Sequence, residues 1–529
     1  MLFPPQVHRF FFLFGLISMG FGVMMGAVPT SVPQFVLLIN WLLEGGFQVK
    51  WNMLRKNKVF WATELLFLIH VAGLLYTDNL SHGIDDLQIK LPLMVLPLVL
   101  FSTRPAEDWA YRGVLYAFLT GCFLNTAWCL IYSFGFHPDE PIRNISRFMS
   151  HIRLGLYLNM AIAVCYMFWT ESKSRRWSIA WLMLALYFFA VMCFMGLASG
   201  LIILTLMLLV GLLLALLRMK WPYKVSVLVL VGALLYFGVG FVKDVYREQI
   251  VPVEGGANTF RAVNEKGSLY VHYDSLGKKE NGYYIQRNIQ LDEVRKTWNA
   301  RCPEDSFSFS PAFHNTHRFE LLIRYLASKG LIKDSAAVAS LSSEDIDNIK
   351  RNIPNYKYNN WTYMRRRLYE LVNEYDDFSA GRNVNGNSVT MRYYFWKAAI
   401  QAIADRPVFG AGTGDVQAQM NKAYAECASP LLPGWWKHPH NQFLTLAVAL
   451  GISGLLLFLF GLFYPAMHLH KKLNVLYACF ALVCTSSFIT EDTIETQAGA
   501  TFFAFFNTVL LSWAFFKKPH NPEDSQKSH

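Results

Sequence analysis

Charged residues are scarce in this chain: Asp, Glu, Lys and Arg make up only 16% of its 529 residues, whereas apolar residues make up 53%. The apolar residues fall in runs longer than the core helices of soluble proteins need. This balance excludes an ordinary soluble domain as the class of the whole chain and indicates a polytopic membrane protein. Cysteine is also rare, with 8 residues. Two of them, Cys302 and Cys427, lie on the predicted outer side. The sequence leaves open whether they form a disulfide bond there.

Twelve apolar segments are candidate membrane spans. The bilayer core is about 30 Å thick and a helix rises about 1.5 Å per residue, so a span needs roughly 20 residues. Two segments are short, and they must both span or neither, because losing one would invert everything after it. The candidates are Phe10–Val28, Val32–Leu43, Val59–Tyr76, Leu91–Phe101, Gly113–Phe136, Leu154–Thr170, two spans within Trp177–Leu217 that turn at Gly196–Gly200, Val225–Val242, Phe443–Tyr464, Leu473–Ile489 and Ala498–Phe516.

Lysine and arginine set the orientation, because positive residues in short loops stay on the cytoplasmic side. If the N-terminus is inside, the inner segments hold 18 Lys and Arg residues and the short outer loops hold 4. We therefore expect both termini in the cytoplasm. The net charge of +11 is then a signal of topology and gives little support to nucleic-acid binding.

These patterns predict an all-α polytopic membrane protein of about twelve transmembrane helices, with a large, mainly helical insertion on the outer side between helices 9 and 10. The predicted parts are nine helices in 1–243, an outer loop domain in 244–440, three helices in 441–516 and a cytoplasmic tail in 517–529. Within the loop domain, Asn281-Gly282 predicts a small β-hairpin. Helical patterns cover Phe319–Asp377 and Ser388–Asp405, the latter stopping before Pro407.

His440 is the leading candidate for a catalytic group. It follows His438-Pro439 and precedes Asn441, so polar side chains cluster at the outer mouth of the tenth span. A neutral imidazole can accept the proton of an attacking hydroxyl, which makes His440 a candidate general base. It could instead cap the helix that follows. Zinc binding by His438 and His440 is weakly supported, because no further outer Cys/His pair has ligand spacing.

Arg153 and Arg392 are candidate ligands for a diphosphate. Each lies at a membrane boundary, where a guanidinium group can bind phosphate through two parallel hydrogen bonds. Each could also simply extend to the lipid headgroups. Glu491, Asp492 and Glu495 form the acidic loop between the last two spans. That loop could orient His440, hold the arginines or only be solvated.

Three further patterns have structural interpretations. Gly410-Ala-Gly412-Thr-Gly414 lacks the lysine and preceding strand of a nucleotide loop, so a tight turn is favoured. Gly451 and Gly454 most simply allow close helix packing. Asp345-Ile-Asp347 resembles a metal motif of nucleotide-sugar enzymes, but Ser342 before it indicates a capped helix start.

The chain resembles the O-antigen ligase and polymerase superfamily of bacterial inner-membrane glycosyltransferases. The resemblance lies in His440-Asn441-x9-Gly451-x-x-Gly454 and in Arg392-x-x-x-Trp396 followed by Pro407-x-x-Gly410-x-Gly412-x-Gly414. It also lies in twelve spans with a large outer loop between spans nine and ten. Residues 254–380 are less typical of the best-known ligases of this superfamily.

The resemblance implies a glycan donor on a polyprenyl diphosphate, usually undecaprenyl diphosphate, and an acceptor hydroxyl on the periplasmic face, without a cofactor or metal. His440 would activate the hydroxyl, and Arg153 and Arg392 would neutralise the diphosphate. The expected partners are this donor, membrane lipid and the lipid A-core of lipopolysaccharide, with no nucleic acid. A polysaccharide polymerase, a protein O-oligosaccharyltransferase and, in another class, a polysaccharide transporter remain alternatives.

Overall fold

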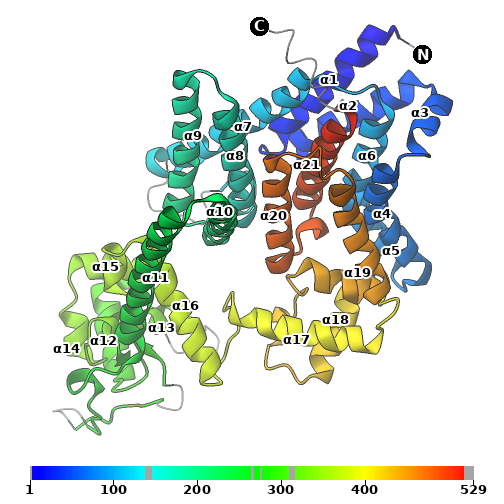
Figure 1. Ribbon diagram of the computed structural model, residues 1–529. Coiled ribbons are helices and arrows are strands. Elements are labelled where there is room, and N and C mark those ends of the chain that lie inside the picture. The colour runs from blue at the N-terminus through cyan, green and yellow to red at the C-terminus, as the bar shows by residue number, and fades with distance from the viewer. Residues whose placement is uncertain (1–2, 137–145, 264–266, 274–276, 309–315, 518–529) are drawn as a thin grey trace. The chain divides into compact units, whose positions relative to one another are not determined.

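The computed structural model describes residues 3–136, 146–263, 267–273, 277–308 and 316–517. Helices dominate this part of the chain, and its strands are two short ones (Figure 1). The predicted tail lies almost wholly outside the described residues. The chain packs as two compact units. The first, the membrane unit, comprises Met1–Ala215 and Arg392–His529, and the second, the insertion unit, comprises Leu216–Met391.

Every segment predicted as a span contains a helix. Eight of these helices are long and apolar enough to cross a membrane, which agrees with a multi-pass membrane protein, while the count of twelve spans stays a prediction. The eight are α4 (Lys58–Gly73, extended by the 3-10 turn η1, Leu74–Tyr76), α7 (Asp108–Ile131, extended by the π-turn η2, Tyr132–Phe136), α8 (His151–Glu171), α9 (Arg175–Phe194), α10 (Ala198–Arg218), α11 (Trp221–Ile250), α19 (Gln442–His468) and α21 (Gln497–Phe516). The other four are α1 (Pro5–Gly22), α2 (Ala27–Glu44), α6 (Pro92–Ser102) and α20 (Val475–Thr490).

Helix α21 provides much of the core of the membrane unit. Every residue from Gly499 to Ser512 is buried, which is expected of a helix with apolar residues on every face. Two helices within Trp177–Leu217 are confirmed, but the turn between them is shorter than the predicted Gly196–Gly200, because α9 ends at Phe194 and α10 already begins at Ala198. Shorter helices complete the unit: α3 (Phe47–Leu54), α5 (Leu80–Lys90), α17 (Thr390–Asp405), α18 (Val416–Glu426) and the 3-10 turns η8 (Pro433–Trp435) and η9 (Thr493–Glu495).

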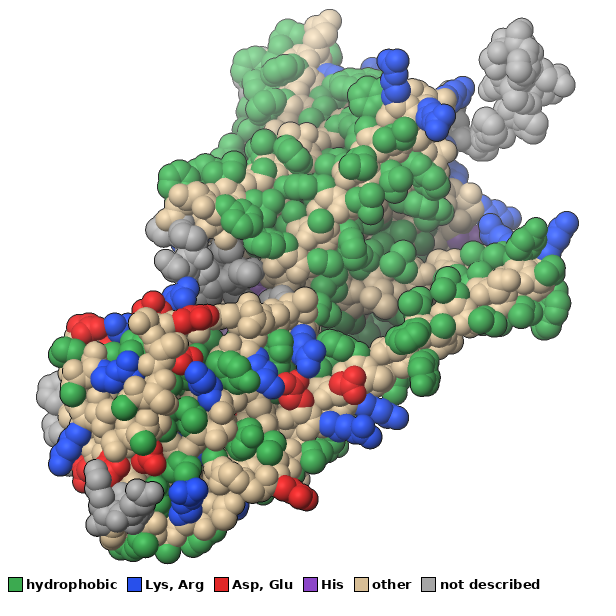
Figure 2. Space-filling model, turned by 90° about the vertical axis from the view of Figure 1, so that its left-hand side faces the viewer, with side chains coloured by type: hydrophobic (Ala, Val, Ile, Leu, Met, Phe, Trp, Pro, Cys, Tyr) green, Lys and Arg blue, Asp and Glu red, His purple; other side chains and the backbone are tan. Residues whose placement is uncertain are grey.

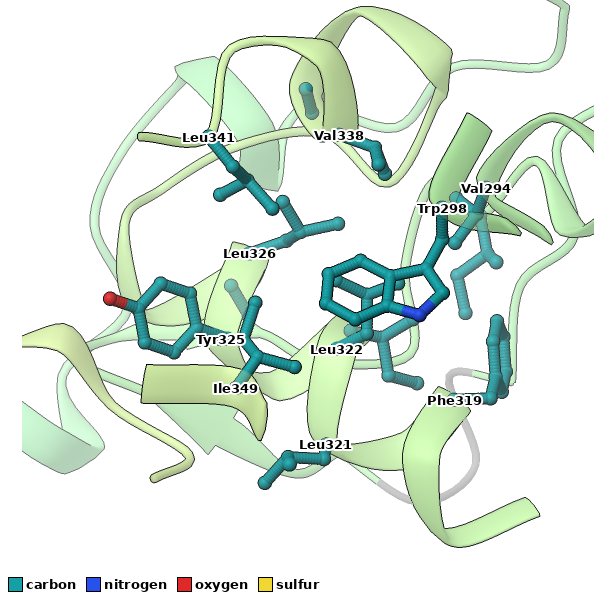
Figure 3. Packing of buried hydrophobic residues seen from close by; sticks show 14 of the residues in the cluster. Val294, Trp298, Phe319, Leu321, Leu322, Tyr325, Leu326, Val338, Leu341 and Ile349 are labelled. Carbon is teal, nitrogen blue, oxygen red and sulfur yellow. The ribbon is translucent and has the colours of Figure 1, made fainter. Parts of the chain in front are cut away.

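The insertion unit has its own hydrophobic core around Trp298, into which Val294, Leu322 and Val338 pack (Figure 3). The predicted hairpin is confirmed: β1 (Lys279–Glu280) pairs antiparallel with β2 (Tyr283–Tyr284). The expected helical stretch 319–377 is helical but divided into several helices. The unit contains α12 (Leu291–Arg301), α13 (Thr316–Ser328), α14 (Ser335–Ala339), α15 (Ser343–Lys350), α16 (Tyr363–Ser379) and the turns η4 (Gly256–Asn258), η6 (Pro303–Asp305) and η7 (Tyr356–Asn359).

The two units differ in the side chains they expose. Figure 2 shows hydrophobic side chains over much of the long apolar helices, whereas Asp and Glu gather over the folded part of the insertion unit.

Ser342 caps α15 in a capping box with Asp345, as its sequence predicts. Asp345 also accepts from Tyr325 and pairs with Lys329, so its carboxylate serves the packing of this unit.

Candidate active site

His440 lies two residues before α19 and does not cap it. The Asn441 side chain is the cap, and it accepts hydrogen bonds from the backbone N–H groups of Phe443 and Leu444. His440 itself has a positive φ of 48°, which is uncommon outside glycine. The imidazole is therefore not used by the helix end, and 38% of the side chain is exposed.

Asp492 fixes the backbone that carries this imidazole. One carboxylate oxygen accepts from the backbone N–H of His440 at 3.0 Å, and the other accepts from the N–H of Asn441 at 2.9 Å and the hydroxyl of Thr445 at 2.6 Å. Burial raises the pKa of the Asp492 carboxyl, while the hydrogen bond from Thr445 opposes that shift. The strained backbone at His440 is thus held by a residue 52 positions later in the chain.

Glu491 joins His440 to Arg392. Its Oε2 lies 3.5 Å from Nδ1 of His440, and its Oε1 accepts from a terminal nitrogen of Arg392 at 2.6 Å. Burial acts to raise the pKa of the Glu491 carboxyl, but the hydrogen bond with His440 and the charge of Arg392 outweigh it and hold this pKa below its ordinary value. A carboxylate beside Nδ1 orients an imidazole so that Nε2 can face a substrate. Among the described residues, Nε2 of His440 has no hydrogen-bond partner.

Helices α17 and α18 support the segment that leads to His440. The Phe395 ring of α17 lies 5.6 Å from the imidazole, centre to centre. Its neighbour Trp396 donates from the indole nitrogen to the Pro439 carbonyl at 3.1 Å, and the Tyr424 hydroxyl of α18 donates to the Lys437 carbonyl at 2.8 Å. The aromatic side chains of Phe395, Trp396 and Tyr424 therefore position the segment 437–440, which ends at His440.

Glu495 serves a different purpose from Glu491. It accepts from Gln442 at 2.7 Å and pairs at 2.6 Å with Lys90, which is fully buried and also pairs with Asp86. Burial acts to raise the pKa of Glu495, but the charge of Lys90 dominates and lowers this pKa to about 2. This buried ion pair joins α5 to the start of α19 and the connection before α21.

His438 is partly exposed and lies near the carboxylates of Asp492 and Glu495. Burial lowers the pKa of its imidazole, and the nearby carboxylates of Asp492 and Glu495 only partly oppose that shift. The neutral form of His438 is therefore favoured. The exposed ring of His440 is the better placed of the two histidines to meet a substrate.

Arg153 lies in a separate cavity of about 250 Å³ at the start of α8. Thr30, Gln497 and Thr501 are among the residues that line it, and neither His440 nor Arg392 does so. Among the described residues, no hydrogen bond or ion pair joins Arg153 to either of those side chains. The structure thus brings together two of the three residues expected at one site and places the third in a separate cavity, which Gln497 at the start of α21 also lines.

The glycine turn at 410–414 packs against a break in α19. At Gly451 the backbone has a φ of 67°, and a Cβ there would overlap the Val408 carbonyl oxygen, so only glycine fits without strain. The N–H groups of Ala411 and Gly412 donate to the carbonyls of Val448 and Ala449, which the break leaves free. These two amides already donate hydrogen bonds within the protein, which favours the tight turn over a phosphate-binding loop. Gly451 therefore permits a helix break, which extends its predicted role in close packing.

Several residues of the site were not expected from the sequence. Thr445 and Gln442 are polar residues in the first turn of an apolar helix, and that pattern could have drawn attention to them. Asp86 and Lys90 are spaced as an ion pair just before α6, which is a weaker signal. No pattern in the neighbouring sequence indicates that either pair contacts the acidic loop at 491–495.

The fold and this cluster define the class of the protein, a helical multi-pass membrane protein with a histidine, arginine and carboxylate cluster before helix α19. Residues 350–459 match the family model described as O-antigen ligase, which confirms the resemblance to the O-antigen ligase superfamily. The matched segment includes Arg392, the glycine turn, His440 and Gly451. A search of the curated proteins finds no match.

Proposed function

We propose that this protein is a glycosyltransferase of the O-antigen ligase type. It would move a glycan from a polyprenyl diphosphate carrier, undecaprenyl diphosphate in the usual case, to an acceptor hydroxyl at the periplasmic face of the bacterial inner membrane. Lipid A-core is the proposed acceptor. The proposal is carried by the single arrangement in which Glu491 joins the exposed imidazole of His440 to the guanidinium of Arg392.

In the proposed reaction, the acceptor oxygen attacks the anomeric carbon of the donor sugar. A new C–O bond forms, the bond from that carbon to the diphosphate oxygen breaks, and the hydroxyl proton passes to Nε2 of His440. Polyprenyl diphosphate leaves with the bonding electrons. Glu491 stabilises the imidazolium that forms, which is the role of a carboxylate beside Nδ1.

Arg392 would stabilise the leaving diphosphate. Only one of its nitrogens is used by Glu491, and a guanidinium offers five N–H donors, so others can reach phosphate oxygens. Arg153 would contribute a second positive charge from its own cavity. Asn441, His438, Asp492 and Glu495 would have supporting roles, since they hold or surround the His440 loop.

The test is transfer in a reconstituted membrane system with purified protein, lipid-linked donor and several acceptors in parallel. His440→Ala and Arg392→Ala should each abolish transfer while the protein stays folded, and Arg112→Ala at an exposed ion pair should not. A chelator should leave transfer unchanged. Normal turnover by His440→Ala would overturn the assignment of the base.

The acceptor needs a separate genetic experiment. Deleting the gene should remove all capped lipopolysaccharide if the acceptor is lipid A-core. A ladder reduced to a single repeat would instead identify a polymerase, and loss of protein glycosylation would identify a protein O-oligosaccharyltransferase.

A further inference from the structure

The insertion unit contains a cavity of about 580 Å³, within the usual range for small-ligand sites. It lies between the end of α11, the β1–β2 turn and η7. Its lining combines aromatic, basic and amide side chains. The residues that the argument uses are Arg247, Asn281, Tyr283, Lys329, Tyr356 and Lys357.

One positive charge of the cavity lining is left uncompensated. Three basic residues line it, against one acidic residue, Glu248, and Lys329 is already paired with Asp345 at 2.6 Å. The Glu248 carboxylate is already used, because it pairs with Lys357 at 2.6 Å and with Arg365 at 2.7 Å. Arg247 forms no ion pair or side-chain hydrogen bond within the described part of the chain. A ligand with an acidic group would therefore find a free guanidinium here.

Two tyrosines give the cavity its aromatic surface. Tyr356 is 37% exposed, and the ammonium groups of Lys329 and Lys357 lie 6.0 and 5.9 Å from its ring centre. The Tyr283 ring packs on the backbone of Gly330, where a Cβ would come within 2.7 Å of it. Aromatic rings beside polar groups suit sugars, whose C–H faces are apolar and whose hydroxyls need hydrogen-bond partners.

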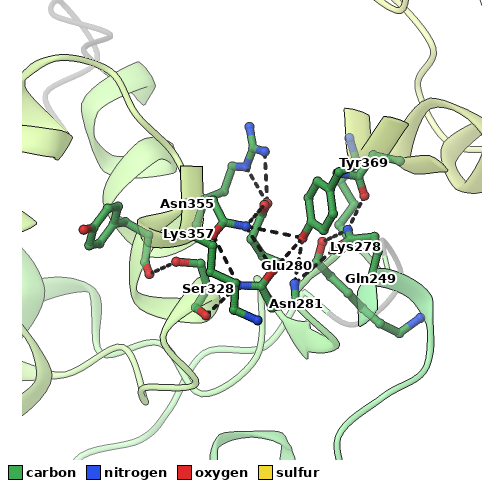
Figure 4. A network of polar contacts seen from close by, with 12 residues as sticks. Gln249, Lys278, Glu280, Asn281, Ser328, Asn355, Lys357 and Tyr369 are labelled. Atoms are coloured by element: carbon green, nitrogen blue, oxygen red, sulfur yellow. Dashed lines mark hydrogen bonds and ion pairs between the residues drawn. The ribbon is translucent and has the colours of Figure 1, made fainter. Parts of the chain in front are cut away.

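The wall of the cavity is fixed by a buried polar network (Figure 4). The backbone N–H of Asn281 donates to the Gln249 side chain and to the Tyr369 hydroxyl, and the Asn281 amide donates to the Ser328 carbonyl at 2.9 Å. The hydroxyl of Ser328 in turn accepts from the backbone N–H of Tyr356. A site held in this way needs little ordering when a ligand binds.

If α11 spans the membrane, as its sequence predicts, the cavity lies close to the membrane surface. The helix is continuous from Trp221 to Ile250 and is one of the candidate spans. Arg247 is five residues beyond Val242, where the predicted apolar segment ends, which corresponds to about 8 Å along a helix. A saccharide attached to a membrane lipid would therefore have its membrane-proximal sugars at the level of Arg247.

We infer that this cavity is a binding site for an anionic saccharide, with Arg247 binding the acidic group and Tyr356 the sugar ring. The inference rests on the chemistry of the insertion unit alone and is independent of the transfer reaction proposed at His440. The acidic group can be a carboxylate or a phosphate, because a guanidinium binds both through the same pair of hydrogen bonds.

The experiment is a binding titration of the full-length protein in detergent, followed by ligand-observed NMR. The probes are glucuronate, glucose 6-phosphate and glucose, which share a ring and differ in the acidic group. Both acidic sugars, or one of them, should bind at least about tenfold more tightly than glucose. Glycerol 3-phosphate tests for a lipid headgroup site, and binding as tight as that of glucose 6-phosphate would overturn the saccharide assignment.

Variants separate the two contacts. Arg247→Gln should remove the preference for acidic sugars, whereas Arg351→Gln, on an exposed position outside the cavity lining, should keep it. Tyr356→Ala should weaken all three sugars and Tyr356→Phe should retain them. The inference fails if no probe binds saturably or if Arg247→Gln changes nothing. His440→Ala should bind normally, so a failed transfer assay would not be confused with a failed site.

Discussion

The carboxylate of Glu491 lies 3.5 Å from Nδ1 of His440 and is shared with Arg392 at 2.6 Å. These contacts link the candidate base to the candidate diphosphate ligand through one side chain. Because both partners are cationic or become so, the carboxylate stabilises whichever of them carries charge as the reaction proceeds. The roles of all three can therefore be tested by changing the residue between them.

Glu491→Gln should reduce the rate constant of transfer by at least about tenfold, since general acid–base catalysis contributes on the order of 100-fold or more. The amide keeps the shape of the side chain but cannot stabilise an imidazolium or balance Arg392. Steady-state transfer kinetics measure the loss, with Glu171→Gln at the exposed pair with Arg112 as the matched control. Unchanged kinetics would show that the imidazole works without this carboxylate.

Asp492→Asn should lower both stability and transfer. Its two oxygens accept three hydrogen bonds, from His440, Asn441 and Thr445, and an amide would turn an N–H group toward one of these donors. The expected loss in free energy of unfolding is about 1–3 kcal/mol. Thermal unfolding in detergent measures it, and a variant as stable as the parent would contradict the assigned contacts.

Arg153→Gln separates the two arginines. If its cavity receives part of the diphosphate, kcat/KM should fall by roughly 10- to 100-fold, the effect of losing a charged hydrogen bond. Full activity in Arg153→Gln, together with an inactive Arg392→Ala, would show that the diphosphate is bound by Arg392 beside Glu491 and not in the cavity of Arg153.

Gly451→Ala should destabilise the protein by more than about 2 kcal/mol, because alanine is strained at positive φ and its Cβ would overlap the Val408 carbonyl. Gly434→Ala is the control, since a Cβ there meets no atom within 4 Å. The midpoint of thermal unfolding should fall only in the first variant.

The Lys90–Glu495 pair predicts a pH dependence of stability. The folded-state pKa of Glu495 is lowered to about 2 from an ordinary 4.5, so this contribution is complete above about pH 4.5 and is lost as the pH falls through about 2. Lys90→Met would leave two partly buried carboxylates, those of Asp86 and Glu495, without their cation and should cost about 3 kcal/mol at neutral pH. Unfolding midpoints from pH 7 down to pH 3 should decline less in Glu495→Gln than in the parent.

Local patterns predicted much of the fold. The length of each apolar run was enough to place a helix, and Asn281-Gly282 was enough to place a turn, because both depend on neighbouring residues. The break at Gly451 was not predicted, since it depends on carbonyl and amide partners at Val408 and Ala411. Periodicity carries no information about such long-range partners.

The candidate site was predicted in part for the same reason. The sequence indicated His440 and Arg392 through their spacing and their place at a membrane boundary. It left three interpretations of the acidic loop open, and only the folded chain shows that Glu491 contacts both residues while Glu495 contacts Lys90, 405 positions earlier. Arg153 has no distinctive spacing, and its cavity could not be assigned from the sequence.

The short connection between α20 and α21 makes a different contact at almost every step. Glu491 and Asp492 contact His440 and its backbone, Glu495 pairs with Lys90, and Gln497, the first residue of α21, borders the cavity of Arg153. Adding or deleting a single residue there would move all these side chains out of register at once. The length of this connection is therefore more tightly constrained than any one of its residues, and a molecule that displaced it would disturb every part of the site together.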